Sequence, residues 1–308
     1  MPVPSTADAD LGETGRVAPG MRFPPETVAA LSAHPRFPEA ARRVAQCLLS
    51  LYRGNRLLNQ LVNDRGRFLL AFLLLHFHYS RRPDDPQSGL TAGRVVETCV
   101  THGICSRGRA KALLMLMRVA GYIAPAPDAA DRRYRVLVPT ERLIALHHDR
   151  WRCQFEAMAL VLPEAATALT LLERPAFAPA FLRPLVAHFM AGNRVIDYSP
   201  ELSGFIDRNA GFLILMSLLL AGDPEQPERP AAISISGLAR RFGVSRAHVL
   251  KFLRDAAEEG LIAREGHGAE QIRLLPRFLA AMHSFIASAF LFNALAAREA
   301  IDATAGAA

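Results

Sequence analysis

The sequence predicts a mainly α-helical fold of two tandem units with small β-hairpins, and three observations lead to this prediction. The chain has 308 residues, of which 51% are hydrophobic and 21% charged, so it can bury a sizeable core. One segment occurs twice, because residues 106–123 align without a gap to residues 245–262. Apolar side chains recur at helical spacing in both copies. We therefore expect two copies of one unit of about 140 residues, the size of a typical domain.

The predicted organisation is a flexible tail over residues 1–24, a first unit over 25–174 and a second unit over 175–308. The tail is rich in Pro, Gly, Ser, Thr and acidic residues and shows little periodicity. The boundary between the units falls where Pro175 and Pro179 interrupt the helical spacing.

Each unit is expected to contain two helices, a short helix, a turn, another helix, a hairpin and a final helix. In the second unit, apolar spacing predicts a helix over 235–242 that Gly243 ends. Ser245 then suits the N-cap of a helix through residue 259, closed by Gly260. Two strands follow, over 261–264 and 271–274. Two helices joined by a short glycine turn and followed by a hairpin form a winged helix-turn-helix.

The helix that follows Ser245 has an apolar face and a basic face. Four apolar residues form one stripe that we expect to be buried: Val249, Phe252, Leu253 and Ala256. The opposite face combines a small residue near the N-terminus with long basic side chains, which suits contact with phosphates or guanine edges in a DNA groove. This face carries Ala247, Lys251, Arg254 and Glu258, with His248 at its edge.

The equivalent helix of the first unit differs on its outer face. Its predicted core stripe is Ala110, Leu113, Leu114 and Met117. The opposite face is apolar, with Gly108, Ala112, Met115 and Val119, while basic residues occupy the sides. An apolar face cannot make hydrogen bonds to base edges, although it can touch thymine methyl groups or pack on protein. The first unit is therefore a weaker reader of DNA or uses this helix for another contact.

The predicted DNA-binding residues lie on these two helices, on the helix before the second one, and on the hairpins. A net charge of +7 agrees with a polyanionic partner. There are two alternatives to DNA contact. The basic helix face could simply be solvated, and the basic hairpin could be an ordinary exposed hairpin. The residues are Arg107, Gly108, Arg109 and Lys111; Arg132, Arg133 and Arg135 of the first hairpin; Arg240, Arg241, Ser245, Arg246, Ala247, His248, Lys251 and Arg254; and His267 of the second hairpin.

With these segments in view, each half resembles the winged-helix domains of the multiple-antibiotic-resistance regulator (MarR) family of bacterial transcriptional regulators. The shared features are the Ser-Arg start of the recognition helix, its Gly-Leu-Ile or Gly-Tyr-Ile exit, and apolar flanking helices. The resemblance implies double-stranded DNA as partner, two recognition helices on successive major grooves, and a small-molecule effector as a further partner. Because both units lie on one chain, we expect a monomeric pseudo-dimer, with a homodimer as the alternative.

Motifs for catalysis are absent from the sequence, which has no G-x-S-x-G, no H-E-x-x-H and no phosphate-binding glycine loop. We therefore expect neither an enzyme nor a cofactor. The nearest metal-like or redox-like cluster is Cys99, His102 and Cys105, and packing explains both cysteines. The adjacent pair His147 and His148 is interpreted as surface or partly buried imidazoles.

The expected location is the reducing cytoplasm. Four cysteines in 308 residues, with no charged and then apolar leader, argue against a secreted disulfide scaffold. The apolar runs 68–77, 211–221 and 284–297 are shorter than the roughly 18 residues of a spanning helix, so we expect no membrane contact.

Three functions remain open at this point. The first is a sequence-specific DNA-binding transcriptional regulator. The second is a replication initiator built of two winged helices, which predicts binding to repeated origin sequences. The third is a protein-interaction module without DNA affinity, which the apolar outer face of the first recognition helix favours.

Overall fold

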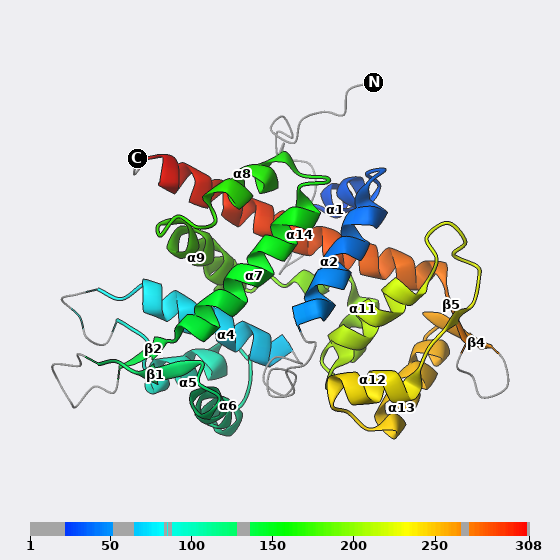
Figure 1. Cartoon of the computed structure of the whole chain (residues 1–308), viewed down its shortest axis with the longest axis horizontal. Helices are drawn as coiled ribbons and strands as arrows, with labels where there is room; N and C mark the ends of the chain where they lie inside the picture. The colour runs from blue at the N-terminus through cyan, green and yellow to red at the C-terminus, as the bar shows by residue number, and fades with distance from the viewer. Residues whose placement is uncertain are drawn as a thin grey trace.

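The computed structural model describes residues 22–51, 65–82, 85, 88–127, 136–265 and 271–306. Within them the chain is mainly helical, with one two-stranded and one three-stranded antiparallel sheet (Figure 1). This confirms the predicted class of a mainly α protein with small hairpins. The finer division into tandem winged-helix units stays a prediction.

The elements fall into two sets with a similar order. The first set is α1 (Pro25–Ser32), α2 (Phe37–Leu51), α4 (Arg65–Tyr79), α5 (Ala92–Thr101), α6 (Arg107–Val119), β1 (Ile123–Pro125), β2 (Leu137–Pro139) and α7 (Glu141–Met158). The second set is α8 (Pro163–Leu171), α9 (Phe177–Met190), η1 (Val195–Tyr198), η2 (Pro200–Leu202), α10 (Ser203–Ile206), α11 (Gly211–Ala221), β3 (Ala231–Ala232), α12 (Ile235–Phe242), α13 (Arg246–Glu258), β4 (Ile262–Glu265), β5 (Gln271–Leu274) and α14 (Pro276–Ala305).

Helices α6 and α13 begin and end in the same way. The hydroxyl of Ser106 accepts a hydrogen bond from the backbone of Arg109, and that of Ser245 accepts one from His248. Each serine thus satisfies a backbone N–H that has no partner inside its helix. After the helices, Gly121 and Gly260 have φ of 74° and 67°, a conformation that disfavours a side chain. The predicted caps of the α13 helix are confirmed.

The hairpins that follow also match. Antiparallel pairing joins β1 to β2 and β4 to β5. Behind each hairpin, the residue before the final helix donates a backbone hydrogen bond to the residue after the glycine: Thr140 to Tyr122 at 2.9 Å, and Leu275 to Leu261 at 3.0 Å. Helices α7 and α14 therefore leave the two hairpins from equivalent positions.

The first two helices of each set correspond as well. Helices α1 and α8 both begin with Pro-Glu, while α2 and α9 both begin with a fully buried phenylalanine, Phe37 and Phe177. The predicted boundary at residues 174–175 stays a prediction, although the match of α8 with α1 favours a division before Pro163.

The two sets of helices cover each other in reciprocal pairs. Helix α2 packs against α11, and its counterpart α9 packs against α4. Likewise α1 packs against α14, and α8 packs against α7. Helix α11 is apolar on nearly all sides and most of its residues are buried, so it needs cover from more than one neighbour. Each set therefore completes the core of the other.

By length and composition, α14 could cross a membrane, which differs from the expectation that no segment is long enough. A search for uninterrupted apolar runs misses this helix. A long window can keep a high mean hydropathy even when it contains an occasional charged residue. The bent pair made of η2–α10 and α11 is long and apolar enough to cross a membrane only if both parts form one span. Within this fold, 56% of the apolar window of α14 is buried inside the protein, against α9, α8 and α1. The mostly buried core helix of a soluble protein can have the same length and composition as α14.

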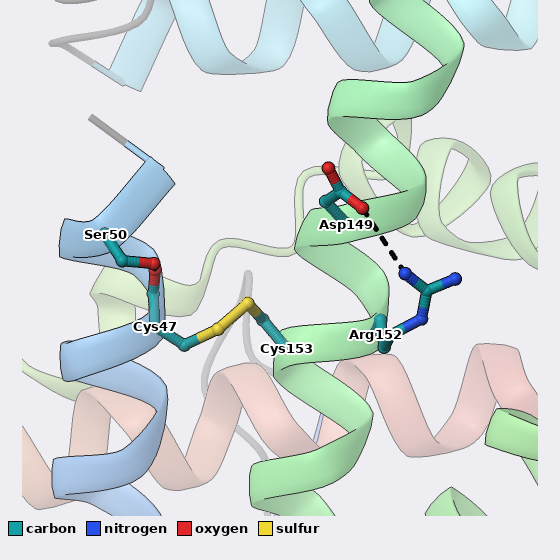
Figure 2. The surroundings of a disulfide bond; sticks show 5 residues. All are labelled: Cys47, Ser50, Asp149, Arg152 and Cys153. Atoms are coloured by element: carbon teal, nitrogen blue, oxygen red, sulfur yellow. Dashed lines mark hydrogen bonds and ion pairs between the residues drawn. A yellow bond between two sulfur atoms is a disulfide. The ribbon is translucent and has the colours of Figure 1, made fainter. Parts of the chain in front are cut away.

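Figure 2 shows a disulfide between Cys47 of α2 and Cys153 of α7. A disulfide is not expected in the reducing cytoplasm that the cysteine count favours. The two residues are 106 positions apart, and their Cα atoms lie 5.8 Å from each other because α2 packs on α7. Cysteine count alone cannot reveal a pair that only tertiary packing brings together. The cytoplasmic location therefore loses one of its arguments and stays a prediction.

Candidate nucleic-acid interface

Helix α13 presents the two faces that its spacing predicts. The apolar stripe of Val249, Phe252, Leu253 and Ala256 is buried, with every member at most 1% exposed. The start of the helix and its outer face are exposed, with Ser245, Arg246, Ala247, Lys251 and Arg254 open to solvent. The helix thus rests on its apolar stripe and turns its basic side chains outward.

An ion-pair cluster lies at the edge of this face. Lys251 Nζ donates to both carboxylate oxygens of Asp255, at 3.0 and 2.8 Å. Arg208 Nη1 donates to the same carboxylate at 2.6 Å. The hydrogen bond from Lys251, followed by that from Arg208, lowers the pKa of Asp255. The ion pair between Lys251 and Asp255 could have been predicted from their i, i+4 spacing on a helix. The ion pair between Arg208 and Asp255 could not, because these residues are 47 positions apart.

Two further predicted residues on this side have partners inside the protein. His248 Nε2 lies 2.9 Å from the carbonyl oxygen of Asn209. Arg241 is half-buried and donates from Nη2 to the carbonyl oxygen of Leu49 at 3.1 Å. Arg241 therefore attaches α12 to α2, and its predicted contact with a DNA backbone stays a prediction. Arg240, its neighbour, is exposed.

Helix α6 buries its predicted stripe of Ala110, Leu113, Leu114 and Met117. The predicted residues Arg107, Gly108, Arg109 and Lys111 are all exposed. The outer face is apolar as expected, because Met115 is 71% exposed and Val119 is 81% exposed. Together with Val100 of α5, these are the exposed large hydrophobic residues of the described chain.

Helices α6 and α13 align at an offset of 251 − 112 = 139 positions. In this alignment, apolar residues on the outer face of α6 correspond to charged residues on the outer face of α13. Ala112 corresponds to Lys251 and Met115 to Arg254. The third pair, Val119 and Glu258, also sets an apolar residue against a charged one. The two helices share a buried face and differ at each of these three outward positions.

Figure 1 shows α6 and α13 at the same lower edge of the molecule, away from α8 and the C-terminal end of α14. The first residues of both helices are exposed. The remaining predicted contacts, Arg132, Arg133, Arg135 and His267, lie outside the described residues.

Other candidate chemistry is weak in the described part of the chain. It contains no group of three or more His, Cys, Asp or Glu residues placed to hold a metal ion. Burial, followed by the neighbouring Cys105, raises the pKa of Cys99 to about 12, so this thiol stays protonated near neutral pH. The packing interpretation of Cys99 is confirmed by its full burial.

Of the two adjacent histidines of α7, His147 differs from the interpretation as a surface or partly buried side chain, whereas His148 agrees with it. His147 is buried at 3% exposure and contacts Phe72 and Trp151. His148 is half-buried, with Nδ1 3.6 Å from a carboxylate oxygen of Glu173. Glu173 reaches this position from the segment after α8, a contact that local sequence could not reveal.

Comparisons with known protein families, curated proteins and solved structures find no match to this chain.

Proposed function

We propose that this protein binds double-stranded DNA sequence-specifically, as a bacterial transcriptional regulator. In this proposal, α5, α6, β1 and β2 act as one winged helix-turn-helix, and α12, α13, β4 and β5 act as a second. The observation that carries the proposal is the matched pair α6 and α13. Both are capped by serine, followed by a hairpin and exposed at the same edge, with basic side chains near their N-termini.

The local geometry of both helices suits a phosphate backbone. Gly108 and Ala247 occupy the second position of their helices, where a small side chain lets the backbone approach a groove. Arg107 and Arg246 precede them and are exposed. Helix N-termini favour anions because their first N–H groups and the helix dipole both point toward them.

The reciprocal packing of the two sets supports a single-chain pseudo-dimer. Pairs such as α2–α11 and α9–α4 fix α6 and α13 relative to each other in the way that a symmetric dimer fixes its two subunits. Two recognition helices on successive major grooves lie roughly 34 Å apart. Because their outer faces differ, the preferred site is an imperfect inverted repeat with two different half-sites.

The test is fluorescence anisotropy of the full chain with a random-sequence duplex over a range of salt concentrations. Each neutralised phosphate contributes about −0.9 to the slope of log K against log salt. We expect a slope that corresponds to several contacts, and a shallower slope for the double variant Arg107→Ala/Arg246→Ala. Arg183→Ala, an exposed residue of α9, is the matched control and should leave the slope unchanged.

A flat salt response would contradict DNA binding and favour the second candidate, a protein-interaction module. One specific observation supports that candidate, namely the exposed apolar pair Met115 and Val119 on α6. If DNA binding holds, sites selected from random oligonucleotides distinguish a regulator from a replication initiator, since the latter should prefer repeated origin sequences.

A further inference from the structure

The outward face of α6 carries a continuous apolar stripe. Its members follow one another at spacings of four, three and four residues, so they lie on one line along the helix. They are Gly108, Ala112, Met115 and Val119, and all four are exposed. The stripe lies opposite the face that α6 buries in the core. Helix α6 therefore has two apolar faces, and the outward one is uncovered in the described structure.

The large exposed hydrophobic residues of the described chain all belong to one pair of helices. They are Val100 on α5, together with Met115 and Val119 on α6. Single apolar side chains scattered over a surface are ordinary, whereas a gathering of them on one element is typical of an interaction site. The stripe is therefore a candidate docking surface.

A row of positive charge borders the stripe on one side. Arg107, Lys111 and Arg118 lie at positions i, i+4 and i+11 of the helix, and all three are exposed. Helix α6 contains no Asp or Glu that could balance this basic row. In α13, by contrast, Lys251 is paired with Asp255 of the same helix.

The internal repeat shows that this pattern is particular to α6. At the offset of 139 positions, Lys111 and Arg118 correspond to Leu250 and Ala257 of α13. The stripe of α6 is replaced in α13 by the charged residues described above. Charge is therefore central in α13, whereas in α6 it lies beside an apolar centre. Because α13 has the same local structure with a charged outer face, folding does not require the apolar stripe of α6.

The stripe and the row together distinguish between three kinds of partner. A DNA groove offers phosphates to the row, but it offers the stripe only thymine methyl groups. A second copy of this chain would bring two basic rows into one interface, where like charges repel. A helix with an apolar stripe and a border of Asp or Glu complements both features. The charge pattern therefore favours an acidic amphipathic helix.

We propose that α6 binds an acidic amphipathic helix of a partner protein. Apolar side chains of that helix pack along the stripe, and its carboxylates meet the basic row. The small residues Gly108 and Ala112 let the two helices approach closely at one end of the stripe. This docking needs no DNA binding. One consequence rests on the proposed function, namely that the partner covers the first recognition helix and so competes with DNA.

Fluorescence anisotropy of the full chain without DNA tests the docking, with a labelled designed peptide as the probe. The probe has about 18 residues, long enough to form a helix on docking, with a leucine stripe bordered by Glu. One comparison peptide has Lys in place of Glu, and a second has the residues of the probe in scrambled order. We expect saturable binding of the probe at one site per chain, at least tenfold tighter than either comparison peptide. Absence of saturable binding, or equal affinity for the scrambled peptide, would overturn the proposal.

Two double variants locate the probe on α6. Met115→Ser/Val119→Ser removes the large side chains of the stripe and should weaken probe binding at least tenfold. Both side chains are exposed, so the core does not depend on them. Lys111→Glu/Arg118→Glu reverses the charge of the border. This second variant should bind the Lys peptide more tightly than the probe.

Arg174→Glu/Arg183→Glu is the matched control, because it makes the same change of charge at two exposed arginines outside α6. It should keep the wild-type preference for the probe. Unchanged probe affinity in a folded Met115→Ser/Val119→Ser protein would place the probe elsewhere and overturn the proposal. If this variant does not fold, the peptide preference of Lys111→Glu/Arg118→Glu decides.

A second copy of the chain is tested by analytical ultracentrifugation of the wild type without peptide. Self-association that Met115→Ser/Val119→Ser abolishes would show that another copy covers the stripe, and the proposal would fail. We expect no dependence of the sedimentation coefficient on the state of the stripe.

The competition with DNA is a separate measurement. If DNA binding holds, saturating probe should weaken binding of the selected duplex at least tenfold, whereas the scrambled peptide should not. Unchanged DNA affinity at saturating probe would overturn the competition. Since the peptide titrations contain no DNA, a failure of DNA binding leaves the result for the docking intact.

Discussion

His147 is a buried imidazole that the fold keeps neutral. Its ring contacts Phe72 and Trp151, and its Nδ1 atom has no hydrogen-bond partner in the described structure. Burial, followed by the charge of Arg150, lowers the pKa of His147 to about 3. In the unfolded chain the same side chain titrates near its ordinary value of 6.5.

The pH dependence of stability follows from this difference. As the pH falls below about 6.5, the unfolded state binds a proton at His147 and the folded state does not, until the pH approaches 3. The free energy of unfolding should therefore fall with pH through this window, by up to about 1.4 kcal/mol per pH unit from this group. Urea unfolding at pH 7 and pH 5 measures the effect, which should be smaller in His147→Phe.

His102→Gln, which changes a partly exposed histidine after α5, is the control and should keep the wild-type pH dependence. His76, whose pKa burial lowers to about 4, is present in all these proteins and contributes equally to each. Identical pH dependence in the wild type and in His147→Phe would show that the imidazole is solvated in solution.

At the scale of elements, α6 and α13 have the same local structure, but the residues on their exposed faces differ. Arg254 of α13 is exposed at the position that Met115 occupies in α6. An arginine can form two hydrogen bonds to a guanine edge, whereas a methionine side chain can only make apolar contact, for example with a thymine methyl group. Under the proposed DNA binding, the two helices should therefore prefer different bases.

We expect Arg254→Ala to weaken binding to the selected site by about 1–3 kcal/mol and to relax base preference in one half-site only. Met115→Ala should relax preference at thymine in the other half-site. Competition binding with single-base variants of the selected site measures both effects. If either variant changes both half-sites equally, α6 and α13 do not read separate halves.

The two helices also show which features sequence can predict. Their serine caps, glycine ends and buried stripes are local, because each depends on residues within a few positions. The apolar outer face of α6 follows from the same periodicity. The strand β4 begins one residue later than predicted, at Ile262, which is an ordinary uncertainty of element ends.

At the scale of the whole molecule, the features that sequence did not predict are long-range contacts. Arg241 binds the carbonyl oxygen of Leu49 from 192 positions away, so its charge is used inside the protein. Arg208 reaches Asp255 in the same way. None of these contacts can be predicted from the periodicity of the sequence.

The disulfide between Cys47 and Cys153 is the strongest of these long-range links, and its effect on stability can be tested. It joins α2 to α7 across 106 positions, and α2 also packs against α11 of the second set. A cross-link over such a long loop restricts the unfolded chain, so its loss should lower the free energy of unfolding by about 2–5 kcal/mol. Denaturant unfolding with and without dithiothreitol measures this change.

Cys47→Ala should lower the stability of the protein by the same amount and remove its response to dithiothreitol. Cys105→Ala is the matched control, because Cys105 is partly exposed and forms no disulfide. It should keep the full response to the reductant. Since α2 contacts both α7 and α11, opening the bond loosens a helix that belongs to both halves of the core. Equal stability of the wild type in oxidising and reducing buffer would mean that the two thiols are not joined in solution, and packing alone would then hold α2 in place.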